Sequence, residues 1–193
     1  MNTKYLLSLS FVMLNIALGH AKDVCNDKHI IETTKLTAAT GETITMQRFN
    51  CSNTAAPAGI SRREPPHIGR SLGPVLKRSA SQCTQANCMC GVPVSFNRCT
   101  AASIKASDCN ILANGLLGMS SPATFFIPSG QGAAFFVETC EASVSNPISA
   151  TMQYCFSDMG IATLQNTNAC GNAEATSSGT FAGNTFFVAN ISP

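Results

Sequence analysis

The spacing of apolar residues beyond position 100 first predicts an amphipathic helix. One set recurs at i, i+3, i+4 and i+7, the spacing of a single helix face, and consists of Cys109, Leu112, Ala113 and Leu116. We expect Ser107 or Asp108 to cap this helix and Gly118 to end it. Cys109 would then anchor the helix to the rest of the protein.

Phenylalanine-rich runs follow the predicted helix. Residues 124–127 and 134–140 are β-prone and flank a turn-like sequence at 128–132, which predicts an antiparallel hairpin. Gly130 and Gly132 fit such a turn better than a phosphate-binding loop, because the third glycine and the following helix are missing.

The C-terminal pattern is mixed. Four residues again fall at helical spacing, namely Met152, Cys155, Phe156 and Met159. Gly160 weakens the helix, so a short strand remains open. Residues 180–181 and 185–191 are typical of a closing strand, and an uncertain strand covers 91–96. The predicted fold is α+β, a small disulfide-rich α/β sandwich whose antiparallel sheet has about four strands, with two helices packed on one face.

Three Phe-Phe pairs place one ring on each face of a strand, at 125–126, 135–136 and 186–187. If helices cover one face, the opposite rings need other cover or an interface. The general preference of phenylalanine for protein interiors favours the simpler interpretation, in which all six rings fill a core.

The first 21 residues predict a signal peptide. Lys4 precedes an apolar run from 5 to 18, and small residues at Gly19 and Ala21 fit a cleavage site. The run is shorter than the roughly 20 residues of a membrane span, and no later stretch is apolar enough. We therefore expect a secreted protein with no stable membrane span.

Ten cysteines follow the predicted signal peptide, at positions 25, 51, 83, 88, 90, 99, 109, 140, 155 and 170. An even number of cysteines on a secretory route predicts disulfides. The alternative is a thiolate zinc site at Cys88 and Cys90, but a partner pair at similar spacing is missing and no histidine follows His67. We expect no metal and no cofactor, and the sequence leaves the disulfide connectivity open.

Charge and composition divide the chain near residue 79. Residues 22–78 hold nine basic and five acidic residues, whereas 79–193 hold two basic and five acidic. Residues 55–78 are rich in Pro, Gly, Ser and Arg, as in an exposed linker that proteases cut. Two dibasic pairs in it, Arg62-Arg63 and Lys77-Arg78, suit a kexin-type processing protease. We predict a pro-segment at 22–78 and a mature domain at 79–193, an ordinary basic linker being the alternative.

The predicted pro-segment contains two β-rich runs, 29–34 and 43–46, joined by a turn at 41–42. A bridge between Cys25 and Cys51 would staple this hairpin. If one of these cysteines pairs with the later eight instead, cleavage after Arg78 would leave two chains held together.

Certain motifs resemble a known group of proteins. They are Asp108-Cys109-x-x-Leu112, Phe125-x-Ile127, Phe136-x-x-Thr139-Cys140 and Met152-x-Tyr154-Cys155. This string resembles small cysteine-rich secreted proteins of basidiomycete fungi. In its order of elements it is similar to the necrosis-inducing effector-like domain and to the killer toxins of smut fungi. The resemblance covers most of 83–193 and implies an α/β sandwich, matured in some of these toxins by cuts after Lys-Arg. It transfers no activity, because fold does not fix function.

Enzyme chemistry has few candidates in the predicted mature domain. The three histidines, His20, His29 and His67, all precede residue 79, which excludes a Ser-His or Cys-His arrangement there. Paired carboxylates remain, Asp108 with Asp158 or Glu138 with Glu141, but the first two can instead serve helix starts. The second two would point to opposite faces of one strand. We expect no enzyme and no catalytic residues.

Binding partners follow from what remains. A domain with two basic residues and net negative charge offers little to nucleic acid. Weak glycosylation sequons begin at Asn50 and Asn190. The preferred hypothesis is a secreted, non-enzymatic effector or toxin-like protein that binds a protein or glycan target outside the secreting cell. The alternative is a cell-wall-associated structural or carbohydrate-binding protein, which the absence of Trp disfavours.

Overall fold

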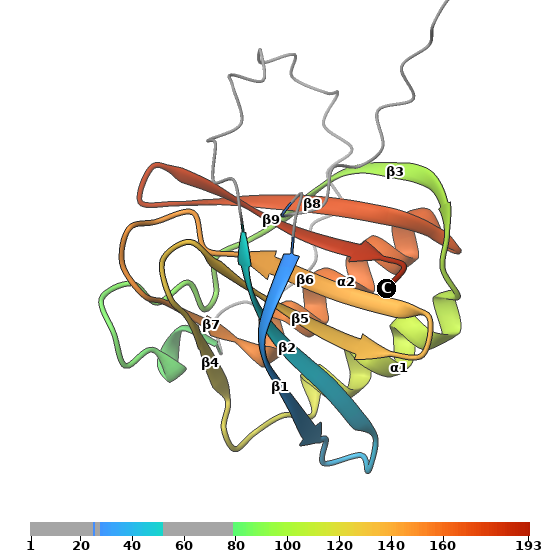
Figure 1. The fold of residues 1–193 in the computed structure, drawn as a ribbon, viewed down its shortest axis with the longest axis horizontal. Coiled ribbons are helices and arrows are strands. Elements are labelled where there is room, and N and C mark those ends of the chain that lie inside the picture. The colour runs from blue at the N-terminus through green and yellow to red at the C-terminus, as the bar shows by residue number, and fades with distance from the viewer. Residues whose placement is uncertain (1–24, 26–27, 52–78) are drawn as a thin grey trace, which may run out of the picture.

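The computed structural model describes residue 25 and residues 28–51 and 79–193. The strands are β1 (Lys28–Thr37), β2 (Thr43–Cys51), β3 (Ser95–Ser103), β4 (Thr124–Ile127), β5 (Gln131–Val137), β6 (Cys140–Ser145), β7 (Met152–Cys155), β8 (Ala173–Phe181) and β9 (Asn184–Ile191). The helices are α1 (Ala106–Leu117), α2 (Phe156–Cys170) and a 3-10 helix at Ser79–Gln82. Figure 1 shows their arrangement.

Seven strands form one antiparallel sheet in the order β1-β2-β5-β6-β9-β8-β3, and β4 pairs with β7 in a second sheet. The predicted sandwich with a sheet of about four strands is therefore wrong. The additional strands of the large sheet have three origins. The hairpin 28–51 joins the sheet, the predicted closing strand is the two strands β8 and β9, and the predicted strand 134–140 is divided between β5 and β6.

A turn divides the run 134–140. Glu138 has a φ of 48°, in the left-handed region that ordinary residues seldom adopt, and β6 begins at Cys140. Glu138 thus lies in a turn and Glu141 on the next strand, contrary to the prediction of one shared strand. The β-propensity of the run gave no sign of this turn, because neither glycine nor proline marks it.

The predicted Phe-rich hairpin is also wrong. β4 pairs with β7, with Phe125 opposite Tyr154, whereas β5 pairs with β2 and β6. The glycine turn was correctly placed, since Gly130 has a φ of 72° and precedes β5. It sends the chain from the small sheet to the large one. Local sequence fixes a turn, but the partners of the two strands depend on the whole fold.

Helix α1 ends at Gly118 as predicted, but its start differs. Lys105 occupies the N-cap without a side-chain cap, and the Ala106 N–H donates to Asn172 Oδ1 over 2.9 Å, from the loop after α2. Asp108 lies in the first turn and does not cap. The missing cap is supplied by a residue distant in sequence, which local spacing cannot reveal.

The predicted element at 152–159 contains both a strand and a helix. Met152–Cys155 is strand β7, the alternative that Gly160 left open, and α2 then runs from Phe156 to Cys170. Likewise β3 begins at Ser95, so most of the uncertain strand 91–96 lies before it. Gly160 is tolerated because its bare Cα allows α1 to approach, since a Cβ there would lie 2.8 Å from the Ala113 carbonyl oxygen.

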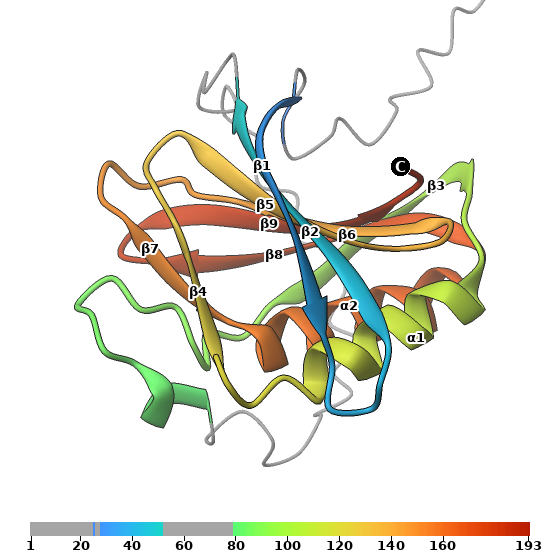
Figure 2. The same ribbon diagram turned by 60° about the horizontal axis from the view of Figure 1, so that its bottom comes forward.

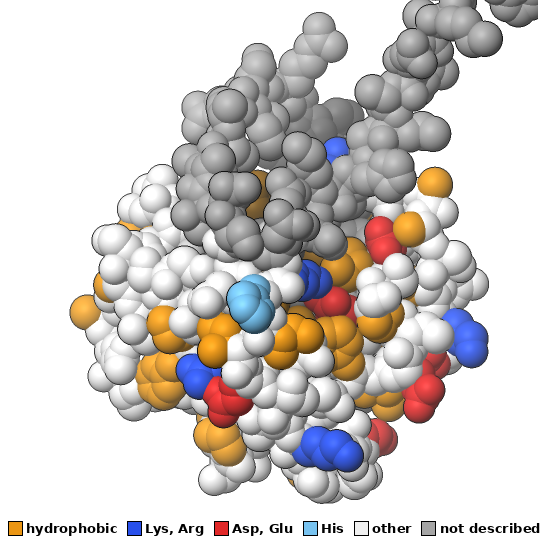
Figure 3. Space-filling model, in the orientation of Figure 1, with side chains coloured by type: hydrophobic (Ala, Val, Ile, Leu, Met, Phe, Trp, Pro, Cys, Tyr) orange, Lys and Arg blue, Asp and Glu red, His pale blue; other side chains and the backbone are white. Residues whose placement is uncertain are grey.

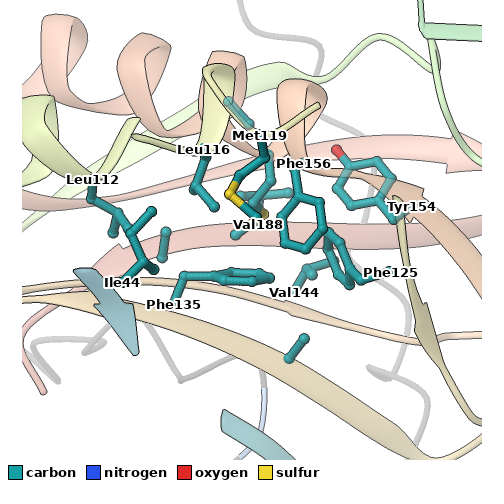
Figure 4. Packing of buried hydrophobic residues seen from close by; sticks show 14 of the residues in the cluster. Ile44, Leu112, Leu116, Met119, Phe125, Phe135, Val144, Tyr154, Phe156 and Val188 are labelled. Atoms are coloured by element: carbon teal, nitrogen blue, oxygen red, sulfur yellow. The ribbon is translucent and has the colours of Figure 1, made fainter. Parts of the chain in front are cut away.

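The helices and the β4–β7 sheet lie on one side of the seven-stranded sheet (Figure 2). α1 contacts β5 and β6, and α2 contacts β8 and β9. The core between these layers contains residues from almost every element (Figure 4). At its centre the Phe125 ring lies 5.0 Å from that of Phe135 and 4.9 Å from that of Phe156. The first pair is edge-to-face and the second is tilted, and aromatic contacts of this kind add to the stabilisation from apolar burial.

Some predictions lie outside the described residues. They concern the signal peptide 1–21, the linker 55–78, and the processing residues Arg62, Arg63, Lys77 and Arg78. The structure does show that residues 28–51 form β1 and β2 of the same sheet as residues from 79–193. None of the helices in the described part of the chain is long and apolar enough to cross a membrane.

Candidate functional site

All ten cysteines pair, and the structure thereby settles the connectivity. The disulfides are Cys25–Cys51, Cys83–Cys88, Cys90–Cys155, Cys99–Cys170 and Cys109–Cys140. The hairpin bridge and the anchoring of α1 by Cys109 agree with the sequence analysis. The chain is therefore a cysteine-rich, disulfide-bonded protein, compatible with an extracellular location.

Among the residues that the structure describes, two groups of side chains have the proximity of metal ligands. They are Cys83, Cys88 and Cys90, and Cys90, Cys155 and Asp158. Each group contains one disulfide, Cys83–Cys88 in the first and Cys90–Cys155 in the second. A sulfur held in a disulfide is not the thiolate that zinc requires. Disulfide formation therefore accounts for both groups.

The nominated carboxylates serve separate structural contacts. Asp108 Oδ2 accepts from the Thr139 hydroxyl over 2.6 Å and from the Thr139 N–H over 3.2 Å. The Thr139 hydroxyl in particular holds the pKa of Asp108 below its usual value, although burial opposes this shift. Asp158 Oδ2 accepts from the Gly91 N–H over 2.6 Å. Glu141 is 3% exposed and forms an ion pair with Lys28.

The two sequons differ in accessibility. Asn50 is exposed on β2, so its glycosylation stays a prediction. Asn190 is fully buried, and its side-chain amide donates to the Thr163 carbonyl oxygen over 2.8 Å and to the Thr167 hydroxyl over 3.2 Å. A glycan on Asn190 is incompatible with this packing.

A shallow hollow on the surface lies between the β1–β2 hairpin and β4. It is a shallow pocket of about 220 Å³, which we call the hairpin groove, and it is lined by Glu32, Thr34, Met46, Arg48 and Phe126. A smaller hollow of about 180 Å³ beside the end of β1 has neither a charged group nor an aromatic ring, and is lined by Thr37, Ala39, Gly118, Met119, Ser120 and Ser121.

The register of the hairpin places the groove residues. β1 and β2 pair with Glu32 opposite Arg48 and Thr34 opposite Met46, so all four side chains share one face. A register shift between Ile30 and Glu32 gives β1 one extra residue before this point. The extra residue lets Ile30 share a face with Phe49 while Glu32 shares the other face with Arg48. Without it, one of these two side chains would lie on the wrong face, because a shift of one residue moves a side chain to the other side of the sheet.

Phe126 completes the groove from β4. Its neighbours Phe125 and Ile127 are buried in the core at 5% and 0% exposure, whereas Phe126 is 41% exposed. Because side chains alternate along a strand, Phe125 and Ile127 anchor β4 in the core and Phe126 points to the surface. Among the six paired phenylalanines, Phe125, Phe135 and Phe186 are buried but Phe126 is exposed, so the interpretation that all six fill a core is wrong.

Charge in the groove is arranged as an exposed pair. The Arg48 guanidinium donates to Glu32 Oε2, the Nε–Oε2 distance being 2.7 Å, and the two side chains are 38% and 48% exposed. An exposed ion pair of this kind stabilises a fold by only about 0–1 kcal/mol. Both side chains can therefore exchange partners with an approaching surface at small cost to the fold.

None of the groove residues was predicted as a site from the sequence, and the favoured interpretation placed the Phe126 ring in the core. Glu32 and Arg48 belong to the segment predicted to be removed, and their proximity depends on the hairpin register. The β-rich character of 29–34 was visible in the sequence, but the bulge was not. Figure 3 shows apolar side chains gathered on the same side of the molecule, over the hairpin and the strands next to it.

Comparison with protein-family models, curated proteins and solved structures found no match for this chain.

Proposed function

We propose that this protein is a secreted, non-enzymatic effector or toxin-like protein that acts by binding a target on or in another cell. In this proposal it is made as a precursor and cut at Arg62-Arg63 or Lys77-Arg78. The resemblance to fungal cysteine-rich proteins, killer toxins among them, belongs to the same proposal. The observation that carries it is the hairpin groove, where an exposed phenylalanine lies beside an exposed ion pair.

The composition of the groove supports binding to a protein surface. Phenylalanine, methionine and arginine are enriched at interfaces, where they combine apolar area with directed hydrogen bonds. Met46 supplies a flexible apolar lining, and Phe126 supplies a ring whose strand is anchored on both sides. The fitting partner has an apolar side chain for Phe126 and a carboxylate for Arg48.

The contacts of the carboxylates argue against the enzyme alternative. Asp108, Asp158 and Glu141 each hold a structural partner on a different element, and Glu138 lies in an exposed turn. Neither the hairpin groove nor the smaller hollow is lined by any of these four groups. A glycosidase needs two carboxyl groups facing one substrate cleft.

Burial of Tyr154 argues against the carbohydrate-binding alternative. Sugar sites commonly present Trp or Tyr, but the chain has no Trp and Tyr154 is fully buried. Burial, and secondarily the charge of Asp158, raises the pKa of the Tyr154 hydroxyl far above its usual value. Phe126 is then the aromatic ring of the groove, and it has no polar group with which to orient a sugar.

A binding experiment with two phenylalanine variants tests the proposal. Phe126→Ala removes the groove ring, whereas Phe96→Ala removes a similarly exposed ring (43%) on the opposite edge of the sheet. Labelled protein is incubated separately with susceptible cells and with insoluble wall polysaccharides. We expect Phe126→Ala to weaken cell binding at least about tenfold, as for an interface anchor, and Phe96→Ala to change it less than about twofold.

Different outcomes would count against different parts of the proposal. Retention on polysaccharide without binding or response in any cell would contradict the effector function and favour the wall protein. Equal loss of binding in both variants would show that the hairpin groove is not the binding surface.

A further inference from the structure

The hairpin formed by β1 and β2 has no disulfide to the rest of the structure. Its one bridge, Cys25–Cys51, joins the two ends of the hairpin to each other. The other four bridges join cysteines between positions 83 and 170. The main chain from residue 51 to residue 79 is therefore the only covalent link between the hairpin and the body, residues 79–193.

Backbone pairing nevertheless makes the hairpin part of the sheet. β2 pairs with β5 in an unbroken antiparallel register from Thr45 opposite Phe136 to Asn50 opposite Gln131. Beyond this ladder, the Cys51 N–H donates to the Gly130 carbonyl oxygen over 3.2 Å. Removing the hairpin would expose β5 as an unpaired edge strand, a template for aggregation.

Side chains secure β2 on the helix-facing side of the sheet. Ile44 is completely buried and belongs to the main core with Leu112 and Leu116 of α1. A Cβ added to Gly115 of α1 would lie 2.7 Å from Ile44 Cδ1, so the glycine provides the space that the isoleucine fills. Ala38, in the turn directly after β1, is 3% exposed in the same core. The core is therefore incomplete without the hairpin.

The opposite face is secured in a similar way. Phe49 is 1% exposed and packs over Gly132, where an added Cβ would lie 2.3 Å from the ring carbon Cζ. Lys28 lies 5.5 Å from the centre of the Phe49 ring and forms an ion pair with the buried Glu141 of β6. The hairpin thus fills a space on each face of the sheet, and it brings a positive charge to a negative one.

We propose that proteolytic cleavage between residues 51 and 79 converts the protein into a stable, non-covalent two-chain protein in which the hairpin remains as β1 and β2. At Lys77-Arg78 a kexin-type protease would add water across the Arg78–Ser79 peptide bond, leaving a carboxylate on Arg78 and an amine on Ser79. This inference rests on the processing step of the proposed function. The hairpin then stays with the body after cleavage as a second chain, and is not released as a pro-segment would be.

The hairpin groove gives the retained subunit a role. Four of the five groove residues, Glu32, Thr34, Met46 and Arg48, belong to the hairpin, and Phe126 alone belongs to the body. A body without its hairpin would lose the groove and expose part of its core. The binding-competent form in this inference is the two-chain protein.

The test uses the secreted full chain cut in solution. One sample is treated with a kexin-type protease, and a matched Lys77→Ala, Arg78→Ala chain tests that site. A second chain carries the recognition sequence of a site-specific viral protease inserted between residues 65 and 66. Native size-exclusion chromatography and intact mass are compared with denaturing, non-reducing separation. Failure of kexin to cut would count against processing, whereas the inserted site tests retention of the hairpin whatever kexin does.

We expect the two chains of the cut protein to co-elute at equal stoichiometry at about 1 µM, and to separate in denaturant without reductant. Ile44→Ala should weaken their association at least about 30-fold, while Ile30→Ala, at a side chain 50% exposed, should change it less than about threefold. A hairpin that elutes alone from the native column would overturn the inference. So would chains that stay joined in denaturant, because they would share a disulfide.

Discussion

Strands β1 and β3 form the two edges of the seven-stranded sheet, and a disulfide lies near each, but the two disulfides connect different things. Cys99 of β3 is joined to Cys170 at the end of α2, 71 residues away in sequence. Cys25 and Cys51 close the hairpin on itself, 26 residues apart. The β3 edge is thus cross-linked to the body, whereas the hairpin edge is attached by packing.

The outermost strands β1 and β3 are both almost entirely exposed, but the pairing that attaches each edge to the rest of the sheet differs. The pairing of β3 with β8 is interrupted twice, and almost all its residues are exposed. β2 pairs with β5 without interruption and buries Ile44 on one face and Phe49 on the other. A cross-link is most useful where few contacts oppose local unfolding, and it adds less where side chains already fill spaces in the core.

The largest expected effect concerns the packed edge. Phe49→Ala should lower the free energy of unfolding by about 3–5 kcal/mol, because it leaves a cavity over Gly132. Ile30→Ala, on an exposed part of β1, should change it by at most about 0.5 kcal/mol. Denaturant unfolding of the uncut chain measures both. Equal values for the two variants would show that packing does not hold this edge.

The cross-linked edge should respond to loss of its disulfide. Replacing Cys99 and Cys170 together by Ala should lower the free energy of unfolding by about 2–4 kcal/mol. Hydrogen exchange should accelerate in β3 and the end of α2 and stay unchanged in β1 and β2. Faster exchange across both edges would contradict the comparison, because it would make the cross-link global rather than local.

Acid should lower the free energy of unfolding by a smaller amount, through a contact that belongs to neither edge. Asp108 of α1 accepts a hydrogen bond from Thr139 in the turn before β6. Its lowered pKa means that the folded state binds fewer protons than the unfolded state near pH 4. Its contribution is complete above the ordinary pKa of about 3.9 and is lost as pH falls through the lower folded value. Asp108→Asn should therefore reduce the fall in stability between about pH 5 and pH 2. An identical pH profile in both proteins would exclude this role.

Local chemistry allowed some features to be predicted from sequence. Gly118 ends α1, Gly130 turns the chain into β5, and the apolar spacing of Leu112 and Leu116 marks the buried face of a helix. The proximity of Cys25 and Cys51 followed from the expected hairpin between them. Each of these predictions depended on residues within about one element of each other, where steric preference and periodicity act directly.

Long-range pairing determined the rest. The sequence alone established ten cysteines in an even set, helix and strand propensities, and a change of charge near residue 79. Only the tertiary structure decided that β4 pairs with β7, that Asn172 caps α1, and that the hairpin joins the sheet. It likewise decided that Glu32, Arg48 and Phe126 share a groove. The physical reason is that strand partners and register are chosen by burial summed over both faces of the whole sheet, which no short segment encodes by itself.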